Sequence, residues 1–227
     1  MAKPALPVDD LFSDLPAELA RALSEKARIV SLSRDQTVFL AGDAGDGCYR
    51  VEEGLLKASV VASGGGERIL AILGPGTLVG ELSMIDGSPR SASVSALRPS
   101  KLSFISRAAF ESFAQSNPEV YRHMTILLAR RLRETNGALA ATSFLPLKGR
   151  VARALISLAE AFGNDVGGGR ILVRQKVTQS DLAAMAGIAR ENVSRILKEW
   201  TDHKLVSRLA GYYCLENRAA IERETSL

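Results

Sequence analysis

The stretch GELSMIDGSPRSASV, residues 80–94, places a glutamate, an arginine and several small hydroxyl residues between two segments that alternate like β-strands. The Arg90 guanidinium can bind a phosphate through two parallel hydrogen bonds. Gly80 and the short segment after it can present backbone amides, while Glu81 can accept a hydrogen bond from a ribose hydroxyl. On chemistry alone an alternative stays open, namely a surface hairpin that turns at Asp86-Gly87 and carries an exposed Glu81–Arg90 ion pair.

Short apolar runs surround this stretch from Val30 to Phe104, among them CYRVEEG, LLKASVVAS and RILAIL. Glycines recur between these runs, at Gly42, Gly45, Gly47, Gly54, Gly64, Gly65, Gly66, Gly74, Gly76, Gly80 and Gly87. Short strands joined by glycine turns predict an all-β barrel or sandwich. Before this region, apolar residues spaced four apart predict a single amphipathic helix, and they are Leu15, Leu19, Leu23 and Ala27.

After Ser106 the spacing of the apolar residues changes from that of short strands to that of a helix. Seven residues then alternate four and three apart, namely Tyr121, Thr125, Leu128, Leu132, Thr135, Leu139 and Thr142. This spacing predicts a coiled-coil seam on a helix of about 27 residues, from Pro118 to Phe144, which we expect to pair with a second copy of itself. The alternative is a helix packed on its own domain. Pro146 ends this helix and can begin the next one, so residues 144–146 are the predicted hinge.

Beyond the hinge the pattern predicts a helix over 148–162, a turn at 164–169, one or two strands over 170–177, two further helices, a hairpin over 204–217 and a short helix over 218–224. Thr178 is a good amino-terminal cap, and Asp181 three residues later completes a capping box. Gly187 suits the tight turn between the two helices, and the second helix begins near Ala189. Helices followed by a β-ribbon are typical of a winged helix-turn-helix.

The helix after Ala189 has two contrasting faces on a 100° wheel. One face is apolar and consists of Val193, Ile196, Leu197 and Trp200. The other is polar and consists of Arg190, Glu191, Ser194, Arg195 and Lys198. Arginine pairs with guanine, glutamate accepts from cytosine, and lysine or serine reaches phosphate, so the polar face suits major-groove readout of DNA. A plain solvated surface is the alternative.

Length and composition predict two domains and argue against catalysis. The 227 residues include only two cysteines, Cys48 and Cys214, and two histidines, His123 and His203. They are too few and too scattered for a disulfide scaffold, a metal site or a Ser-His-Asp triad, so we expect neither an enzyme nor a bound metal. No apolar run is long enough to span a membrane and MAKPALPVDDLF is not laid out as a signal peptide, so we expect a cytoplasmic protein.

Charge is uneven along the chain. Residues 1–145 hold 16 Lys and Arg against 16 Asp and Glu, whereas residues 146–227 hold 13 against 9. The whole net charge of +4 therefore lies in the part with the predicted helix-turn-helix. A basic surface there suits a polyanion such as DNA.

Residues 178–198 resemble the helix-turn-helix of the cyclic-AMP receptor/FNR superfamily of bacterial transcription regulators, and RENVSR matches the pattern of its recognition helix. The resemblance implies that Arg190, Glu191 and Arg195 read a TGTGA-like half-site. Gln179 and Ala189 depart from the receptor, which has an arginine and a serine there, and fewer phosphate contacts imply a shallower salt dependence. The candidate DNA-binding residues are Thr178, Gln179, Ser180, Ala189, Arg190, Glu191, Asn192, Ser194, Arg195 and Lys198.

GELSMIDGSPRSA likewise resembles the phosphate-binding cassette of cyclic nucleotide-binding domains, and FLAGDAGDGCYRVEEG, residues 39–54, resembles their β-roll signature. Aligning LARRLRETNG with the superfamily implies that Thr135 and Asn136 contact the base; Asn136 suits guanine as well as adenine, and Thr135 could instead set the coiled-coil register. The ligand implied is cyclic AMP, cyclic GMP or both. The candidate nucleotide-binding residues are Leu70, Leu73, Val79, Gly80, Glu81, Leu82, Ser83, Pro89, Arg90, Ser91, Ala92, Arg131, Thr135 and Asn136.

Together these features predict an α+β chain with a jelly-roll-like β-roll domain over 1–117, a dimerisation helix and hinge over 118–145, and a winged helix-turn-helix over 146–227. The predicted function is that of a homodimeric transcription regulator. A cyclic nucleotide controls its binding to a pseudo-palindromic site on double-stranded DNA. The resemblance adds RNA polymerase as a partner. Two alternatives stay open: a regulator of the same superfamily that senses redox state, a gas or haem, and a cyclic-nucleotide module that regulates a protein partner.

Overall fold

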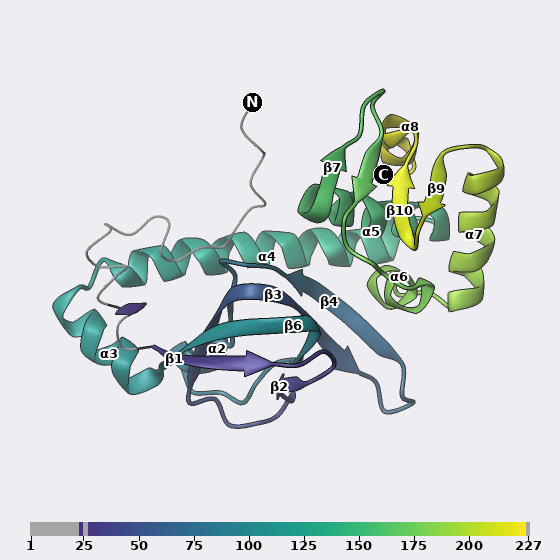
Figure 1. Cartoon of the computed structure of the whole chain (residues 1–227). Coiled ribbons are helices and arrows are strands. Elements are labelled where there is room, and N and C mark those ends of the chain that lie inside the picture. Colours follow the sequence, from purple (N-terminus) through teal and green to yellow (C-terminus); the bar gives the residue numbers. More distant parts are fainter. Residues whose placement is uncertain (1–22, 25–26, 226–227) are drawn as a thin grey trace. The chain divides into compact units, whose positions relative to one another are not determined.

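A computed structural model describes residues 23–24 and 27–225 (Figure 1). The described residues up to Arg133 form one compact unit, here called the β-roll unit, and those from Glu134 onward form a second, the winged-helix unit. The amphipathic helix predicted over Leu15, Leu19, Leu23 and Ala27 lies mostly outside the described residues, although Leu23 is fully buried. The three predicted domain ranges, 1–117, 118–145 and 146–227, stay a prediction.

The β-roll unit contains one antiparallel sheet with the strand order β1-β6-β3-β4, in which β2 also pairs with β6 and β5 with β3. The strands are β1 (Arg28–Leu32), β2 (Thr37–Phe39), β3 (Gly47–Val61), β4 (Glu67–Leu73), β5 (Leu78–Val79) and β6 (Ser93–Ser106). Between β5 and β6 lies the short helix α2 (Glu81–Asp86). Residues 80–94 therefore connect two strands of this sheet, as predicted.

The predicted glycine turn at Gly54 is wrong, because the chain continues through this residue as one strand. CYRVEEG and LLKASVVAS form the single 15-residue strand β3, whose pairing with β6 shifts register on either side of Gly54. Gly54 has φ +102°, and a Cβ there would lie 2.0 Å from the Ser100 side-chain oxygen. Only glycine fits such a bulge, so the residue bends a strand rather than ending it.

Two apolar clusters form the core of the β-roll unit. One lies within the sheet and includes Leu56, Val94 and Leu102. The other joins the sheet to the helices α3 (Arg107–Ser116) and α4 (Val120–Phe144), and its members are Leu23, Cys48, Leu78, Met84, Ile105, Phe110, Phe113, Ala114, Val120, Met124 and Leu127. The first turns of α4 are thus packed against the end of the sheet that carries α2.

The long helix α4 has 25 residues and begins at Val120, two residues later than predicted, because Pro118 and Glu119 form a turn before it. It ends at Phe144, as predicted. Three apolar residues of the predicted seam are exposed: Tyr121 at 49%, Leu132 at 61% and Leu139 at 66%. Phe144 at the end of the helix is 75% exposed. In a single chain this seam therefore has large apolar side chains in solvent.

The winged-helix unit combines helices with a four-stranded antiparallel sheet of order β7-β8-β10-β9. Its elements are α5 (Leu147–Phe162), β7 (Gly163–Asp165), β8 (Ile171–Val173), α6 (Gln179–Ala186), α7 (Arg190–Asp202), β9 (Val206–Leu209), β10 (Tyr212–Leu215) and α8 (Arg218–Arg223). The predicted turn at 164–169 is shorter than expected, because residues 163–165 pair with β8. The predicted hairpin is present, and Ala210 and Gly211 turn with positive φ values of 49° and 88°. The chain is thus an α+β protein, as predicted.

Among the described residues, none of the helices has the length and apolar character that crossing a membrane requires.

Candidate functional site

The segment after β5 is built around two left-handed glycines. Gly80 (φ 81°, ψ 11°) precedes α2 and Gly87 (φ 76°, ψ 0°) ends it. A Cβ on Gly80 would lie 2.4 Å from Nη1 of Arg90, so a side chain there would displace the guanidinium. The alternative of a surface hairpin with an exposed Glu81–Arg90 pair is wrong, because the segment is helical and both side chains are buried, at 2% and 4% exposure.

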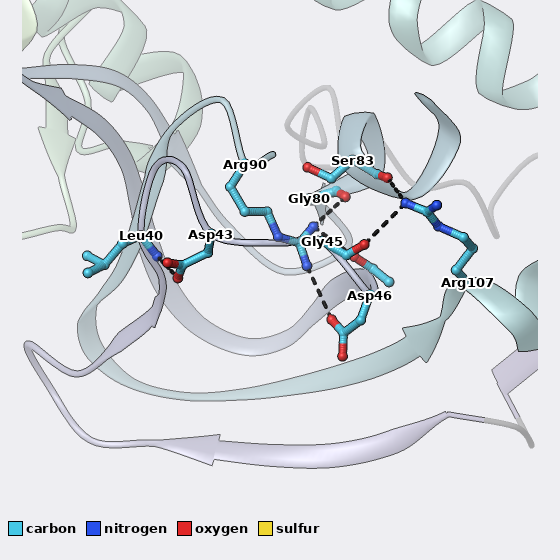
Figure 2. A network of polar contacts seen from close by, with 9 residues as sticks. Leu40, Asp43, Gly45, Asp46, Gly80, Ser83, Arg90 and Arg107 are labelled. Carbon is cyan, nitrogen blue, oxygen red and sulfur yellow. Dashed lines mark hydrogen bonds and ion pairs between the residues drawn. The ribbon is translucent and has the colours of Figure 1, made fainter. Parts of the chain in front are cut away.

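Arg90 is fixed from several directions (Figure 2). Its Nη1 donates hydrogen bonds to the carbonyl oxygens of Gly47 (2.8 Å) and Gly80 (2.7 Å). The Phe39 ring lies under the guanidinium, with its centroid 4.3 Å from Cζ. Nη2 is 3.6 Å from Oδ1 of Asp46, whose side chain is 78% exposed. The buried Nε has no hydrogen-bond partner within the described part of the chain.

The loop between β2 and β3 covers this arginine. The backbone N–H of Gly42 donates to the Arg90 carbonyl (2.8 Å), and the Arg90 N–H donates to the Asp43 carbonyl (2.9 Å). A Cβ on Gly45 would lie 2.2 Å from Cβ of Ser83, so only glycine lets the loop approach α2 this closely. The loop and the cassette thus form one packed structure.

Arg107, the first residue of α3, ties the loop to α2. Its Nη2 donates to the carbonyl oxygens of Gly45 (3.2 Å) and Ser83 (Figure 2). Its backbone N–H donates to the Asp46 carbonyl (2.8 Å). Arg107, Phe39 and Asp46 are site residues that the sequence reasoning missed. The only available signal was the FLAGDAGDG run, which resembled a β-roll signature without showing which side chains would reach Arg90.

Glu81 is paired with the long helix. Nη1 of Arg131, on α4, donates to Oε1 of Glu81, and Nη2 of Arg131 donates to the Leu78 carbonyl. Glu81 is 2% exposed, whereas a quarter of the Arg131 side chain is exposed. The structure therefore brings together Gly80, Glu81, Arg90 and Arg131, four of the candidate nucleotide-binding residues.

The remaining candidate nucleotide-binding residues are distributed unevenly. Leu73, Val79 and Ser83 are buried, and Ala92 is half-buried. The others are exposed: Leu70, Leu82, Pro89, Ser91, Thr135 and Asn136. Leu70 and Leu82 are 56% and 43% exposed, so neither lies in an enclosed apolar pocket of this chain. Thr135 and Asn136 lie on α4, in the turn that follows Arg131.

The two cysteines are buried and belong to different units. Burial, followed by the negative charge of Glu81, raises the pKa of the Cys48 thiol to about 12. Burial also raises the pKa of Cys214. Thiols that keep their protons are poor nucleophiles and poor redox sensors, so these residues do not favour the redox alternative. In the residues that the structure describes, no three His, Cys, Asp or Glu side chains gather as metal ligands.

The second candidate site is the α6–α7 pair. The Thr178 hydroxyl accepts from the Asp181 N–H (3.0 Å), and the Asp181 carboxylate accepts from the Thr178 N–H (2.8 Å), which is the predicted capping box. Gly187 ends α6 with φ 65° and Ala189 precedes α7, so the predicted turn is confirmed.

The predicted division of α7 into two faces is also present. Val193, Ile196, Leu197 and Trp200 are buried. The polar face is exposed and consists of Arg190, Glu191, Ser194, Arg195 and Lys198. Within this face Arg195 donates to the Asn192 side-chain oxygen (3.1 Å), and Lys198 lies 3.5 Å from Asp202. Thr178, Ser180 and Ala189 are exposed, whereas Gln179 and Asn192 are half-buried.

Comparisons with known proteins match both parts of the chain. Residues 29–117 match the cyclic nucleotide-binding domain family, and residues 149–224 match the Crp-like helix-turn-helix domain family. The chain is 34% identical over 201 residues to the CRP-like cAMP-activated global transcriptional regulator of Mycobacterium tuberculosis, covering 88% of this chain and 89% of that protein. It is 35% identical over 213 residues to the cyclic AMP receptor protein of Thermus thermophilus, covering 93% and 94%.

A solved structure shares the fold. FixK2 from Bradyrhizobium japonicum superimposes with a TM-score of 0.77 at 19% identity, over 88% of this chain and 98% of that one. The two domain matches and the two sequence relatives extend over both units described above. The chain therefore belongs to the CRP/FNR family of DNA-binding transcription regulators, with a cyclic nucleotide-binding domain followed by a Crp-like helix-turn-helix domain.

Proposed function

We propose that this regulator is a homodimer whose binding to DNA is controlled by cyclic AMP, with cyclic GMP as a second ligand to be tested. The observation that carries the proposal is the Nε–Nη2 edge of the Arg90 guanidinium, where Nη2 has only the distant, exposed Asp46 carboxylate and Nε has no partner in the described residues. One nitrogen, Nη1, is occupied by two carbonyl oxygens, whereas Nε is buried without a partner. Nε and Nη2 together form the edge of a guanidinium that binds two phosphate oxygens side by side.

A buried guanidinium requires an anion, and the protein supplies only a weak one. The Asp46 carboxylate is 3.6 Å from Nη2 and mostly in solvent, so its ion pair with Arg90 contributes little stability. A phosphate on the Nε–Nη2 edge would replace this contact, and Asp46 would turn to solvent. The names of the M. tuberculosis and T. thermophilus relatives, which refer to cAMP, support the cyclic nucleotide as the source of that phosphate.

Glu81 connects such a ligand to α4. A ribose hydroxyl on Glu81 would contact a carboxylate that Arg131 of α4 already holds. A ligand that binds one position of α4 more tightly than another shifts the population toward the position that it prefers. The resulting change in DNA affinity cannot exceed the ratio of the ligand's affinities for the two states. Further along α4, we propose Thr135 and Asn136 as the residues that contact the base. Asn136 offers both a donor and an acceptor, which is why both nucleotides belong in the test.

The dimer is proposed from the exposed seam of α4. Tyr121, Leu132 and Leu139 are exposed apolar residues at heptad spacing, which a second copy of the helix would cover. We expect Leu132→Asp to yield a monomer in analytical ultracentrifugation. Arg133→Asp, an exposed neighbour outside the seam, is the matched control and should stay dimeric. A dimeric Leu132→Asp protein would contradict the proposed seam.

For DNA we propose that the polar face of α7 reads TGTGA-like half-sites of a pseudo-palindrome, with RNA polymerase as the protein partner at promoters. The two arginines of this face, Arg190 and Arg195, carry the guanine contacts and Glu191 the cytosine contact. Two α7 helices of a dimer, one helical turn of DNA apart, match the two-fold symmetry of such a site.

The test uses calorimetry and a DNA-binding assay on the same variants. Wild type should bind cAMP, cGMP or both, Arg90→Ala should bind neither, and Arg98→Ala, an exposed arginine of β6, should behave as wild type. Fluorescence anisotropy on a TGTGA-type duplex should then show ligand-dependent binding by wild type and ligand-independent, weak binding by Arg90→Ala. Normal titration of Arg90→Ala with either nucleotide would refute the cassette assignment.

A further inference from the structure

Phe39, the last residue of β2, lies directly under the buried arginine of the cassette. It is 9% exposed, and the centroid of its ring is 4.3 Å from Cζ of Arg90. The ring also lies beside the start of α2, since a Cβ on Gly80 would be 3.3 Å from its Cε1 atom. One aromatic ring therefore supports both the guanidinium and the glycine that precedes the cassette helix.

The ring supplies part of the negative potential that a buried guanidinium needs. In the described part of the chain, Asp46 carries the carboxylate that pairs with Arg90, and this side chain is 78% exposed. A cation is attracted to the electron-rich face of an aromatic ring, and the attraction is stronger where water is excluded. Because Arg90 is only 4% exposed, the ring of Phe39 helps to keep this charged side chain buried.

Phe39 holds the guanidinium without competing with a phosphate. A phosphate binds through two N–H groups of one guanidinium edge, each of which donates to an oxygen. An aromatic ring attracts the cation but offers no oxygen, so the Nε–Nη2 edge stays available. The carboxylate of Asp46 differs in this respect, because it lies at that edge as an anion (Figure 2).

The contacts of Arg90 within the chain determine its orientation. Its Nη1 is held by the carbonyl oxygens of Gly47 and Gly80, and its Cζ by the ring of Phe39. A long side chain that must be ordered when a ligand binds weakens that binding. We infer that Phe39 is a positioning residue of the phosphate site, whose ring keeps the Arg90 guanidinium in the orientation that receives the phosphate. The inference rests on the proposed binding of a cyclic nucleotide and adds the residue that prepares the site for it.

A purely structural role for Phe39 is the alternative that the test must separate. Phe39 belongs to the apolar cluster within the sheet, together with Leu56, Val94 and Leu102. A side chain that only fills space acts through its volume, whereas the positioning role depends on the electron density of the ring. The experiments therefore change these two properties separately.

The first experiment changes the electron density of the ring while nearly keeping its shape. Phenylalanines with one, two or three fluorine atoms, incorporated at position 39 of the full chain, have a less electron-rich face and attract a cation less. Calorimetry should show that the affinity for cAMP falls with each added fluorine. The same series at Phe113, which is buried in the other cluster, should leave the affinity unchanged. Equal affinities across the series at position 39 would overturn the inference.

The second experiment removes the ring. Ordering one long side chain lowers affinity by up to about tenfold, so Phe39→Leu should bind cAMP about tenfold more weakly than wild type, a change of about 1.4 kcal/mol. Phe113→Leu is the matched control, because both variants shorten a buried phenylalanine and should lower the thermal midpoint. Phe113→Leu should bind cAMP as wild type does, at a temperature below both midpoints. A lower midpoint with wild-type affinity for Phe39→Leu would show that the ring serves folding alone, which contradicts the inference.

NMR reports on the orientation of Arg90 in the free protein. The Nε–H of Arg90 is buried, so it should exchange slowly with water and give a signal that the Phe39 ring current shifts. The signal is identified by its loss in Arg90→Lys. Phe39→Leu should shift or broaden it and Phe113→Leu should not; an unchanged signal in Phe39→Leu would overturn the inference. Should wild type bind neither cAMP nor cGMP, the proposed function fails and the inference with it, whereas normal binding by both wild type and Phe39→Leu refutes the inference alone.

Discussion

Removing Arg131 should open the β-roll unit far more often than removing any other arginine of α4. Glu81 is 2% exposed, and Arg131 holds one of its carboxylate oxygens. Without Arg131 a buried carboxylate loses its cation, which typically costs 3–5 kcal/mol, because the remaining charge stays buried without its partner. A quarter of the Arg131 side chain is exposed, so some water can enter, and we expect Arg131→Ala to cost about 3 kcal/mol, near the lower end.

The two cysteines report on the two units in one assay. Cys48 is in the β-roll unit and Cys214 in the winged-helix unit, and both are 1% exposed. A neutral thiol reagent at pH 8 modifies each only when its unit opens, and the rate follows the population of the open form when closing is fast. A loss of about 3 kcal/mol corresponds to labelling of Cys48 about 150 times faster, measured by mass spectrometry of quenched samples.

Three comparisons make this prediction refutable. Cys214 in the same sample should be labelled at the wild-type rate, and the exposed Arg133→Ala should leave both rates unchanged. Replacing both partners, as Glu81→Met with Arg131→Met, should restore most of the protection, because an apolar pair leaves no buried charge. A rise for Cys48 below about fivefold, or an equal rise for Cys214, would refute the reasoning.

Three further variants test local features. Gly54→Ala should lower the thermal midpoint, since φ is +102° and its Cβ would meet Ser100, whereas Gly64→Ala, in open space, should not. Thr178→Ala should lower the free energy of unfolding by about 1 kcal/mol, because the variant loses the cap of α6. Denaturant unfolding followed by Trp200 fluorescence measures this change, and an unchanged free energy would contradict the role of the cap. Between pH 9 and 12 the Cys48 thiol of the native protein keeps a proton that the unfolded chain releases. The free energy of unfolding should therefore fall as the pH rises through this range. Cys48→Ala should abolish this part of the decline.

The elements that the sequence predicted well are those whose cause lies within a few residues. Thr178 and Asp181 cap a helix three residues apart, and Gly187 turns the chain because it alone tolerates a left-handed conformation there. The exposed seam of α4 follows from heptad spacing in the same way. Arg90 and Glu81 stand in one short stretch, so the sequence could single them out as candidates, although their chemistry alone left a surface ion pair open as an alternative.

Tertiary structure alone decided what these side chains contact. Glu81 pairs with Arg131, fifty residues away, rather than with nearby Arg90, because the first turns of α4 pack on the end of the sheet that carries α2. Phe39, Asp46 and Arg107 reach the cassette only because β2, β3 and β6 bring their ends together there. A sequence pattern records periodicity and local hydrogen bonding, whereas contacts between distant strands depend on pairing and register. For that reason the sequence could indicate which residue types would serve a phosphate site. It could not indicate which side chains would contact the Arg90 guanidinium, or which of its nitrogens would lack a partner.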